Sequence, residues 1–373
     1  MSSSQTSARN FLDMIIPEVR LGGARNIVEL AKSLGTPVET TRYKVKGMLR
    51  RGLKIDACLD FSKFGLVAHY AHLDLTERTR ANEKKFFKLL ADHGYLASCA
   101  RRLPGTGYAC RFLVPAQKTG KSKGGVAGSL TRLLRILMEE KLLQHARAHD
   151  VSWEKNHMIQ PEYFDLKRGS WKIDWVKLRR ETNIPQRGEA KAEGENQIQF
   201  DELDLMIARE LESDALARLS DIAGGLRTTL NNIFYHFHKH VLEGKYLEEF
   251  VLRWSGTQKQ PTVCAQFEFE GLSVAEEKTS RNILRRIPYL WSDALSTDTG
   301  FYTALAMIPQ EQYLETLYYL SSTLGETAQK LEICLVDSRT RQVFPLPVHL
   351  YKDSMWRFDP EESARQITSR LRR

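Results

Sequence analysis

Residues 37–51 carry side-chain types that bind nucleic acid. The candidate contacts are Thr40, Thr41, Arg42, Lys44, Lys46, Arg50 and Arg51. Hydroxyl and backbone N–H groups near a helix start can bind phosphate, and an arginine can bind guanine through two hydrogen bonds. Glu39 would repel phosphate unless it accepts a hydrogen bond from a cytosine amino group. The alternative for such a charge run is a solvated basic surface, and we predict that these seven residues contact DNA.

Residues 229–243 form a second candidate surface that is polar but hardly basic. With Arg227 in the preceding turn, the candidate contacts are Arg227, Asn231, Asn232, Tyr235, His236, His238 and Lys239. Asparagine can pair with adenine, whereas neutral histidines release few counterions from DNA. His236 and His240 share one helical face, so a metal or a proton switch is conceivable. Exposed or packed histidines are the commoner explanation, and we assign no metal.

Apolar residues between 201 and 247 recur at helical spacing in three blocks, which predicts three helices. Gly224-Gly225 forms a tight turn before the third helix, Thr229 is placed to cap it, and Gly244 to end it. Three helices with a tight turn before the last are typical of a helix-turn-helix unit, and the extended segment Tyr246–Trp254 makes it winged.

The segment that begins at Asn26 repeats this pattern. Glu29-Leu30-Ala31 aligns with Asp221-Ile222-Ala223, and Gly52 aligns with Gly244, with no gap between these landmarks. A repeat of this length bears on the whole architecture. Both copies resemble the winged helix of the Lrp/AsnC family of transcription regulators. The resemblance rests on LDLMIARELESDALARLSDIAGGL with GKYL, and on VELAKSLG with GLKI.

The remaining segments predict an α+β protein in which each winged helix-turn-helix domain precedes a ferredoxin-like βαββαβ domain. We expect domains at 9–60, 61–185 (with a basic linker at 118–128), 198–256 and 261–373. The first sheet domain is expected to contain a strand at 63–76, a helix at 77–93, strands at 95–102 and 107–114, and a helix at 129–149. Segments 153–159 and 163–166 are expected to complete its sheet.

The second sheet domain repeats the order. We expect strands at 262–270, 291–296, 300–308, 329–336 and 343–350, and helices at 274–287 and 310–324. Both domains carry a late tag, Ser170-Trp171-Lys172-Ile173-Asp174 and Met355-Trp356-Arg357-Phe358-Asp359. We therefore predict a tandem duplication. The family resemblance implies that such domains pair through their sheets, so one chain could fold as its own pseudo-dimer.

Composition limits the partners. The formal net charge is +9 and the isoelectric point about 9.2, which favours an anionic partner. The five cysteines have no CxxC spacing, so we expect buried thiols in a reducing cytoplasm and no zinc site on them. No apolar run could span a bilayer, the start lacks a signal-peptide pattern, and there is neither a phosphate loop nor a catalytic constellation.

These features predict a cytoplasmic, sequence-specific DNA-binding regulator of transcription. Helices 37–51 and 229–243 would enter successive major grooves of double-stranded DNA, and the wings would contact phosphate. The family resemblance implies that a small-molecule effector of unknown identity can bind between sensor domains and that homo-oligomers can form through the ferredoxin-like sheets. We expect no resident cofactor.

Two rival functions remain. Siroheme decarboxylases resemble the same architecture and hold a tetrapyrrole near histidine and arginine. On that resemblance His69, His72, Arg101, Arg102 and Arg111 are the candidate residues here. The basic charge and the basic first helix weigh against this enzyme. The other rival is an architectural or adaptor protein whose first half binds DNA non-specifically.

Overall fold

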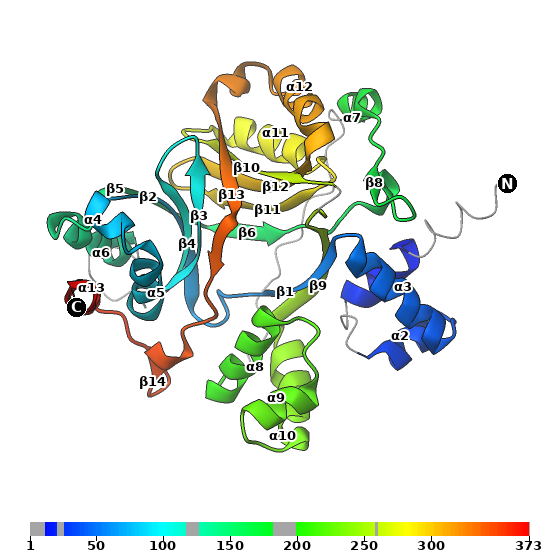
Figure 1. Cartoon of the computed structure of the whole chain (residues 1–373), viewed down its shortest axis with the longest axis horizontal. Coiled ribbons are helices and arrows are strands. Elements are labelled where there is room, and N and C mark those ends of the chain that lie inside the picture. The colour runs from blue at the N-terminus through cyan, green and yellow to red at the C-terminus, as the bar shows by residue number, and fades with distance from the viewer. Residues whose placement is uncertain (1–11, 21–25, 117–126, 182–198, 258–259, 373) are drawn as a thin grey trace.

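The computed structural model describes residues 12–20, 26–116, 127–181, 199–257 and 260–372. Within these ranges no helix is both long and apolar enough to cross a membrane. The fold is mixed α/β and is built around one large sheet, with two groups of short helices beside it (Figure 1). The two groups contain the recognition helices that the sequence predicts.

The first helical group comprises residues 12–20, α2 (Ile27–Ser33) and α3 (Val38–Arg50), and is followed by strand β1 (Leu53–Leu59). The Asn26 side chain accepts hydrogen bonds from the N–H groups of Val28 and Glu29 and so caps α2. The chain turns at Gly35, whose φ of 60° suits glycine. The predicted helix-turn-helix order is confirmed here.

The second group comprises α8 (Glu202–Ser213), α9 (Leu219–Gly225), α10 (Leu230–Tyr235) and a π-helical segment, η2 (His236–Leu242). Asp201 and Asp204 form a reciprocal capping box at the start of α8. Thr229 caps α10 as predicted, because its hydroxyl accepts from the N–H of Asn232. The π-helical segment was not predicted, and it continues the recognition helix down to β9 (Leu247–Trp254).

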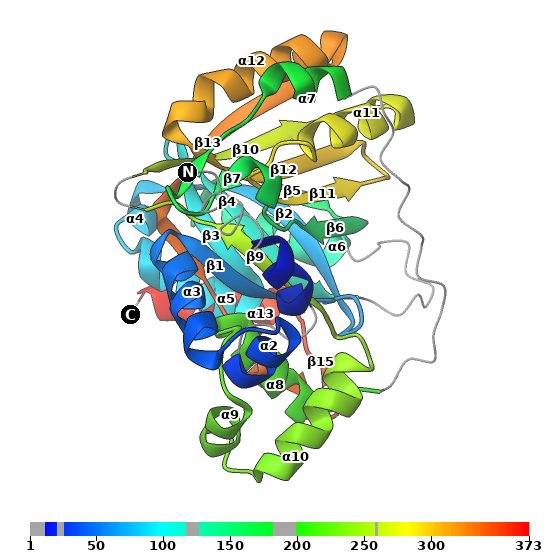
Figure 2. The ribbon, with the colours of Figure 1, turned by 90° about the vertical axis from the view of Figure 1, so that its right-hand side faces the viewer.

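Strands β1 and β9 pair with each other in an antiparallel two-stranded sheet, so neither is a free wing. Leu53 lies opposite Trp254 and Ile55 opposite Leu252, and all four side chains are buried. Figure 2 shows β1 and β9 between the two helical groups and the large sheet. Each strand uses one edge and its apolar face to join the two halves, and contact of these strands with phosphate stays a prediction.

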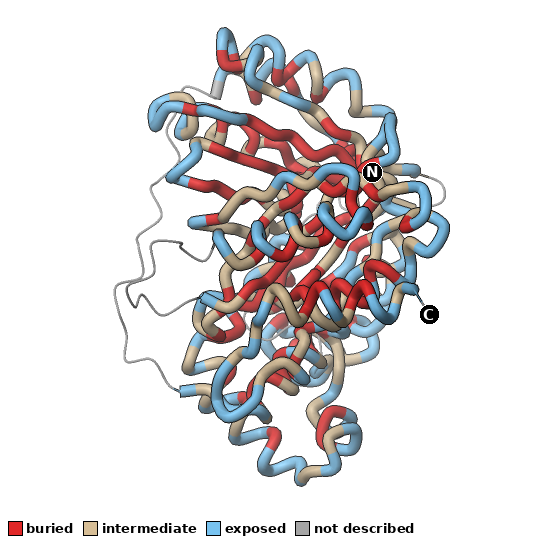
Figure 3. The backbone as a smooth tube through the Cα atoms, turned by 90° about the vertical axis from the view of Figure 1, so that its left-hand side faces the viewer, coloured by how far each residue is buried: buried red, intermediate tan, exposed pale blue. Residues whose placement is uncertain are grey.

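The large sheet has nine strands in the order β5-β2-β4-β3-β13-β10-β12-β11-β6. The bounds are β2 (Leu66–Leu75), β3 (Leu96–Leu103), β4 (Tyr108–Pro115), β5 (Leu143–Asp150), β6 (Trp153–Asn156), β10 (Thr262–Phe269), β11 (Leu290–Ser296), β12 (Phe301–Pro309) and β13 (Leu331–Val343). The helices packed on it are α4 (Glu77–Arg80), α5 (Glu83–Gly94), α6 (Ala127–Glu139), α11 (Val274–Leu284) and α12 (Tyr313–Thr323). Figure 3 shows the strands as the most continuously buried part of the chain.

Each half of the sheet has the same strand order. The first half reads β5-β2-β4-β3 and the second β13-β10-β12-β11, which is the order of fourth, first, third and second strand in both. This agrees with the predicted βαββαβ units and is what a duplication would produce. The duplication and the domain boundaries themselves stay predictions.

Two seams join the halves. Strand β3 pairs with β13, and β11 pairs with β6. Because only Val151 and Ser152 separate β5 from β6, one stretch of chain forms both edges of the sheet. The N–H of Val151 donates to Ala68 of the first half, and that of Ser152 to Leu295 of the second. The sheet therefore curves back on itself and encloses an interior.

The structure differs from the predicted elements at three places. The helix expected at 129–149 ends at Glu139, because Lys141 adopts a positive φ of 58° and the chain then continues as β5. The strands expected at 329–336 and 343–350 are one strand, β13, followed by a 3-10 turn. Strand β5, rather than 153–166, completes the first half-sheet, and β6 belongs to the seam.

The two tryptophan tags lie in equivalent hairpins. Trp171 is on β8 (Ser170–Trp171), paired with β7 (Phe164–Asp165), and Trp356 is on β15 (Met355–Trp356), paired with β14 (Tyr351–Lys352). The helices α7 (Trp175–Glu181) and α13 (Pro360–Arg372) follow. Each tag contacts the other half, since Trp171 packs edge-on against Tyr289 at 5.3 Å and Trp356 against Tyr95 at 6.0 Å.

Candidate functional sites

The outer face of α3 presents most of the predicted DNA contacts. Thr40, Arg42, Lys46 and Arg50 are exposed, and Lys44 is half-buried. Arg42 forms an ion pair with Glu39, so the acidic side chain that should repel phosphate has a cationic partner one turn away. Arg51 is half-buried and donates to the Gly47 carbonyl oxygen at 2.8 Å, which occupies part of its guanidinium.

Thr41 must be removed from this surface. Its side chain is fully buried, where its hydroxyl donates to the Pro37 carbonyl oxygen at 3.2 Å and lies 2.6 Å from the hydroxyl of Thr36. Sequence reasoning also missed Tyr43, which is 76% exposed on the same helix. A large aromatic residue left in solvent inside a basic face is a signal that could have been used.

The recognition helix of the second group has a different surface. Arg227, Asn231, Asn232, Tyr235, His238 and Lys239 are exposed. Lys239 pairs with Glu243, and the Asn232 amide donates to the Thr228 hydroxyl at 3.2 Å. Leu230 and Phe234 are about half exposed, so the face is apolar as well as polar. It has less free positive charge than α3.

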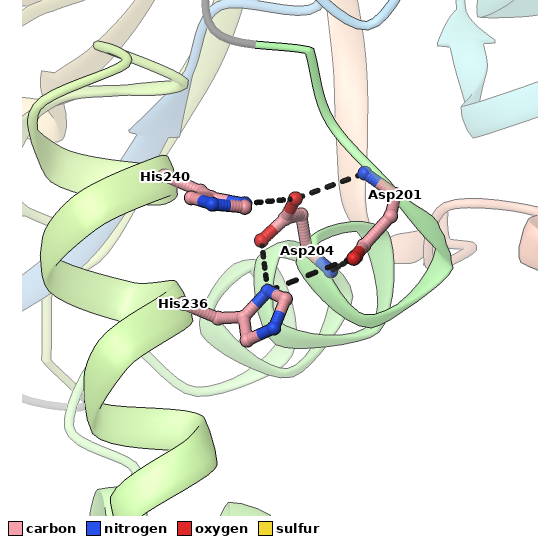
Figure 4. Close-up of side chains that lie close together, drawn as sticks. All are labelled: Asp201, Asp204, His236 and His240. Carbon is pink, nitrogen blue, oxygen red and sulfur yellow. Dashed lines mark hydrogen bonds and ion pairs between the residues drawn. The ribbon is translucent and has the colours of Figure 1, made fainter.

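His236 is corrected from a DNA contact to a member of an internal cluster. Its side chain is only 12% exposed, and its Nδ1 lies 2.9 Å from Asp204 Oδ1. His240 Nδ1 lies 2.8 Å from the other oxygen, Asp204 Oδ2. Figure 4 shows both imidazole rings directed from the π-helical segment toward the start of α8, where Asp201 and Asp204 lie. We call these four residues the Asp/His cluster.

A cavity of about 500 Å³ lies between the two half-sheets and the β1–β9 pair. Both halves line it, with Tyr70 and Arg111 from the first and Gln266 and Trp291 from the second. Its volume is in the range of small-molecule sites. Arg111 binds Glu154 through two hydrogen bonds of 2.6 and 2.9 Å, and the Tyr70 hydroxyl donates to the same carboxylate at 2.8 Å.

Two further arginines of this cavity differ in their partners. Arg253 is paired with Asp56 at 3.2 Å and stacks over the Trp291 ring. Arg341 lies over the same ring, 5.7 Å from its centroid, but within the described residues it has neither an ion pair nor a hydrogen bond. Arg341 lines the cavity but is exposed to solvent, and partial desolvation by nearby protein atoms lowers the pKa of its guanidinium. An anionic ligand would supply the missing counter-charge.

The cavity wall also contains an acid with an altered proton affinity. Burial raises the pKa of Glu212, on α8, to about 7. The N–H of Leu346 donates to its Oε2 at 3.1 Å and partly opposes that shift. A carboxyl group that titrates near neutrality can exchange a proton with a bound molecule.

The cysteines do not supply a nucleophile. All five are buried and free, and burial raises the pKa of the Cys58, Cys99 and Cys264 thiols to about 12. Thiols with such values are protonated at neutral pH and are poor nucleophiles. The five do not gather into a metal site among the described residues, where the Asp/His cluster is the group that could hold an ion.

Of the residues considered for a tetrapyrrole enzyme, Arg111 lines the cavity and the others do not. His69 lies 2.8 Å from Asp150, and His72 lies 2.9 Å from Glu268. Arg101 pairs with Glu83 and Arg102 with Glu332. No histidine is among the described residues that line the cavity.

The described residues therefore form a mixed α/β protein with two helix-turn-helix groups and a sheet-enclosed cavity. Solved structures with a similar fold are known. No protein-family model and no curated protein matches the chain. The crystal structure of the siroheme decarboxylase NirDL superposes with a TM-score of 0.52 at 11% identity, covering 97% of this chain and 99% of that one. NirDL in complex with an iron-uroporphyrin III analogue gives 0.50 at 9% identity, over 89% and 91%.

The E. coli AsnC structure matches 42% of this chain and 95% of its own, at 16% identity, with a TM-score of only 0.24, which is too weak a likeness to support an inference about function. At identities near 10% the NirDL likeness establishes a shared fold and not a shared activity.

Proposed function

We propose that this chain is a DNA-binding regulator of transcription in which α3 is the principal DNA contact. The observation that carries the proposal is the exposed basic face of α3, formed by Thr40, Arg42, Lys46 and Arg50. The opposite face of α3 buries Val45 and Met48, so the helix is fixed to the body of the protein. Lys46 and Arg50 are exposed to meet phosphate, whereas Arg42 must exchange its ion pair with Glu39 for a phosphate contact.

The second recognition helix would then contribute contacts of another kind. Its exposed Asn231 and Asn232 can hydrogen-bond base edges, and its lysine is already paired with Glu243. The two halves would be a tandem duplication that acts as an asymmetric pseudo-dimer. The equal strand orders of the half-sheets support this, as does the β1–β9 pair that ties the two helical groups together.

The central cavity would hold the effector. Arg341, which lacks an anionic partner within the described residues, favours a molecule with a carboxylate group. Trp291 beneath the guanidinium offers an aromatic surface for the rest of the ligand. We propose a carboxylate-bearing, partly flat effector.

The test of DNA binding uses the double variant Arg42→Ala/Lys46→Ala and fluorescence anisotropy over a range of salt. Loss of two phosphate contacts should lower the slope of log affinity against log salt by about 1.8, since each contact contributes about 0.9. The matched control is Lys84→Ala/Lys85→Ala, which removes the same charge from the exposed face of α5. Equal slopes for the wild type and the α3 variant would exclude α3 as the contact.

Selection of bound fragments from genomic DNA separates regulation from an architectural role. A shared sequence motif supports the regulator, whereas binding without sequence preference supports an architectural or adaptor protein.

A second candidate is an enzyme of the siroheme decarboxylase kind. Glu212, with a pKa of about 7 in the cavity wall, favours it, because a decarboxylation needs a proton donor for the carbon that loses its carboxylate. The full-length NirDL likeness supports the fold such an enzyme would need. Incubation with siroheme and mass analysis of the product is the test, with Glu212→Gln as the inactive variant and Glu210→Gln on the same helix as the control. Unchanged siroheme would exclude this candidate.

A further inference from the structure

The Asp/His cluster combines residue types that ligate transition metals and lies outside both the DNA surface and the cavity. Asp201 and Asp204 come from the first turn of α8, and His236 and His240 come one turn apart from η2, which packs against α8. One ligand atom from each residue lies within 4.8 Å of all the others. We propose that this cluster binds one divalent transition-metal ion, with Zn²⁺ as the best fit.

The spacing of the ligand atoms suits a small tetrahedral ion. A Zn²⁺ ion with bonds of about 2.0–2.1 Å separates its ligand atoms by about 3.3 Å. Asp204 Oδ2 is 2.8 Å from His240 Nδ1, Asp204 Oδ1 is 2.9 Å from His236 Nδ1, and His236 Nδ1 is 3.7 Å from Asp201 Oδ1, while all four ligand atoms lie within 4.8 Å of one another. Side-chain shifts of about an ångström would therefore bring one atom from each residue to a common ion. Two imidazole nitrogens with two carboxylate oxygens form a ligand set that zinc accepts.

Charge also favours a cation at this position. The Asp204 carboxylate is fully buried, and its partners among the described residues are two imidazoles and the backbone N–H of Asp201. With neutral imidazoles, two carboxylates leave a charge of −2 that a divalent ion balances. The amino end of the α8 dipole is slightly unfavourable for a cation, but it acts on a site with two full negative charges.

The cluster is also accessible. The side chains of His236 and His240 are 12% and 18% exposed, and that of Asp201 is 55% exposed, so an ion can enter from solvent past Asp201. An ion bound here would link α8 to the recognition helix and hold the π-helical segment in place. This consequence does not depend on whether the helix contacts DNA.

The test is a titration of the purified full chain with Co²⁺, followed by competition with Zn²⁺. Tetrahedral Co²⁺ gives strong visible absorption bands, which should saturate at one equivalent and disappear when Zn²⁺ is added. His240→Gln and His236→Gln should each lower the affinity at least about tenfold. His238→Gln, which removes an exposed histidine from the same helix, is the matched control and should bind as the wild type does.

Circular dichroism of each variant shows whether it is folded. If either His236→Gln or His240→Gln does not fold, the other still tests the site. A rise in Tm with Zn²⁺ in the wild type and in His238→Gln, but not in His240→Gln, is expected. No saturable Co²⁺ bands, or equal loss in His238→Gln and His240→Gln, would overturn the proposal. Without saturable Co²⁺ bands, hydrogen bonds alone would hold the cluster together.

Discussion

At the scale of single residues, three arginines and two glutamates line the cavity and take different roles there. Arg111 and Arg253 are held by carboxylates and are structural. Arg341 is exposed to solvent and has no ion pair among the described residues, whereas Glu212 is an acid weakened by burial. Residues that a fold leaves unbalanced are the ones through which it can respond to a ligand or to pH.

The raised pKa of Glu212 predicts a stability effect. Because its folded pKa, about 7, exceeds the ordinary value of 4.5, its stabilising contribution is complete below pH 4.5 and is lost as the pH rises through 7. Glu212→Gln should therefore be more stable than the wild type at pH 8, by roughly 1–2 kcal/mol after allowance for water in the cavity. At pH 4.5 the two should be equal.

Urea unfolding at both pH values measures this difference. Glu210→Gln neutralises a carboxylate two residues away and is the control, which should leave the pH dependence of the wild type intact. A Glu212→Gln variant that is no more stable than the wild type at pH 8 would show that this carboxylate is hydrated in the folded protein.

The second residue-scale prediction concerns Arg341. If the cavity takes a flat carboxylate-bearing effector as proposed, an iron-uroporphyrin probe should bind Arg341→Gln at least about tenfold more weakly than the wild type, because a charged hydrogen bond contributes about 1.5–3 kcal/mol. Arg339→Gln, at an 86% exposed side chain paired with Asp337, should not change the affinity. Visible absorption of the probe gives both constants. Equal weakening in the two variants would mean that the probe binds the outer surface.

At the scale of elements, the recognition helices could be predicted because their information is local. Apolar spacing, the Gly224-Gly225 turn and the Thr229 cap together fix α10 within the sequence itself. The segment 143–150 could not be assigned in the same way. It follows a strong amphipathic helix with no glycine or proline between, and pairing with β2 rather than local preference makes it a strand.

The Asp/His cluster shows the same limit. The spacing of His236 and His240 was visible in the sequence, but their acidic partners lie on α8, more than thirty positions earlier. In the sequence, Asp204 is indistinguishable from an ordinary capping residue in an acidic first turn. Its side chain is completely buried because α8 packs against the π-helical segment. No local pattern encodes that contact.

The β1–β9 pair makes a testable prediction at this scale. Leu252 has no exposed surface and faces Ile55 across the pair, so Leu252→Ala should lower the free energy of unfolding by about 2–5 kcal/mol. Lys54→Ala, on the opposite strand with a side chain 60% exposed, should change it by less than about 1 kcal/mol. Urea unfolding followed by tryptophan fluorescence measures both. A small loss for Leu252→Ala would mean that the pair is dispensable.

At the scale of the whole molecule, strand pairing runs without interruption from one half of the sheet into the other at both seams. Local patterns predicted the strands of the two halves apart from β5, but not the seams, since the seams depend on edges whose partners are more than a hundred residues away. The contacts of Trp171 with Tyr289 and of Trp356 with Tyr95 add reciprocal packing across the halves. We therefore expect one cooperative unit.

Separate expression of residues 1–181 and 199–373 tests that expectation. Each half alone would expose the unpaired edge of β3 or of β11 together with the apolar wall of the cavity, and exposed edges favour aggregation. We expect neither half to be a folded monomer and the two to form a 1:1 complex when co-expressed. Size-exclusion chromatography measures the size of each half and of the complex, and circular dichroism measures their folding. A half that is monomeric and unfolds cooperatively by itself would contradict the prediction.

The unlike surfaces of α3 and α10 have a consequence for the target, if the chain acts on DNA as proposed. A symmetric dimer presents two identical readers and therefore selects a palindrome. Here one reader is cationic, with Arg42 and Lys46, and the other is neutral, with Asn231 and Asn232, and the β1–β9 pair fixes both in one body. The operator would then be non-palindromic and would have a direction. Inverting it within a promoter would turn the bound protein end for end, so that the opposite half faced the polymerase.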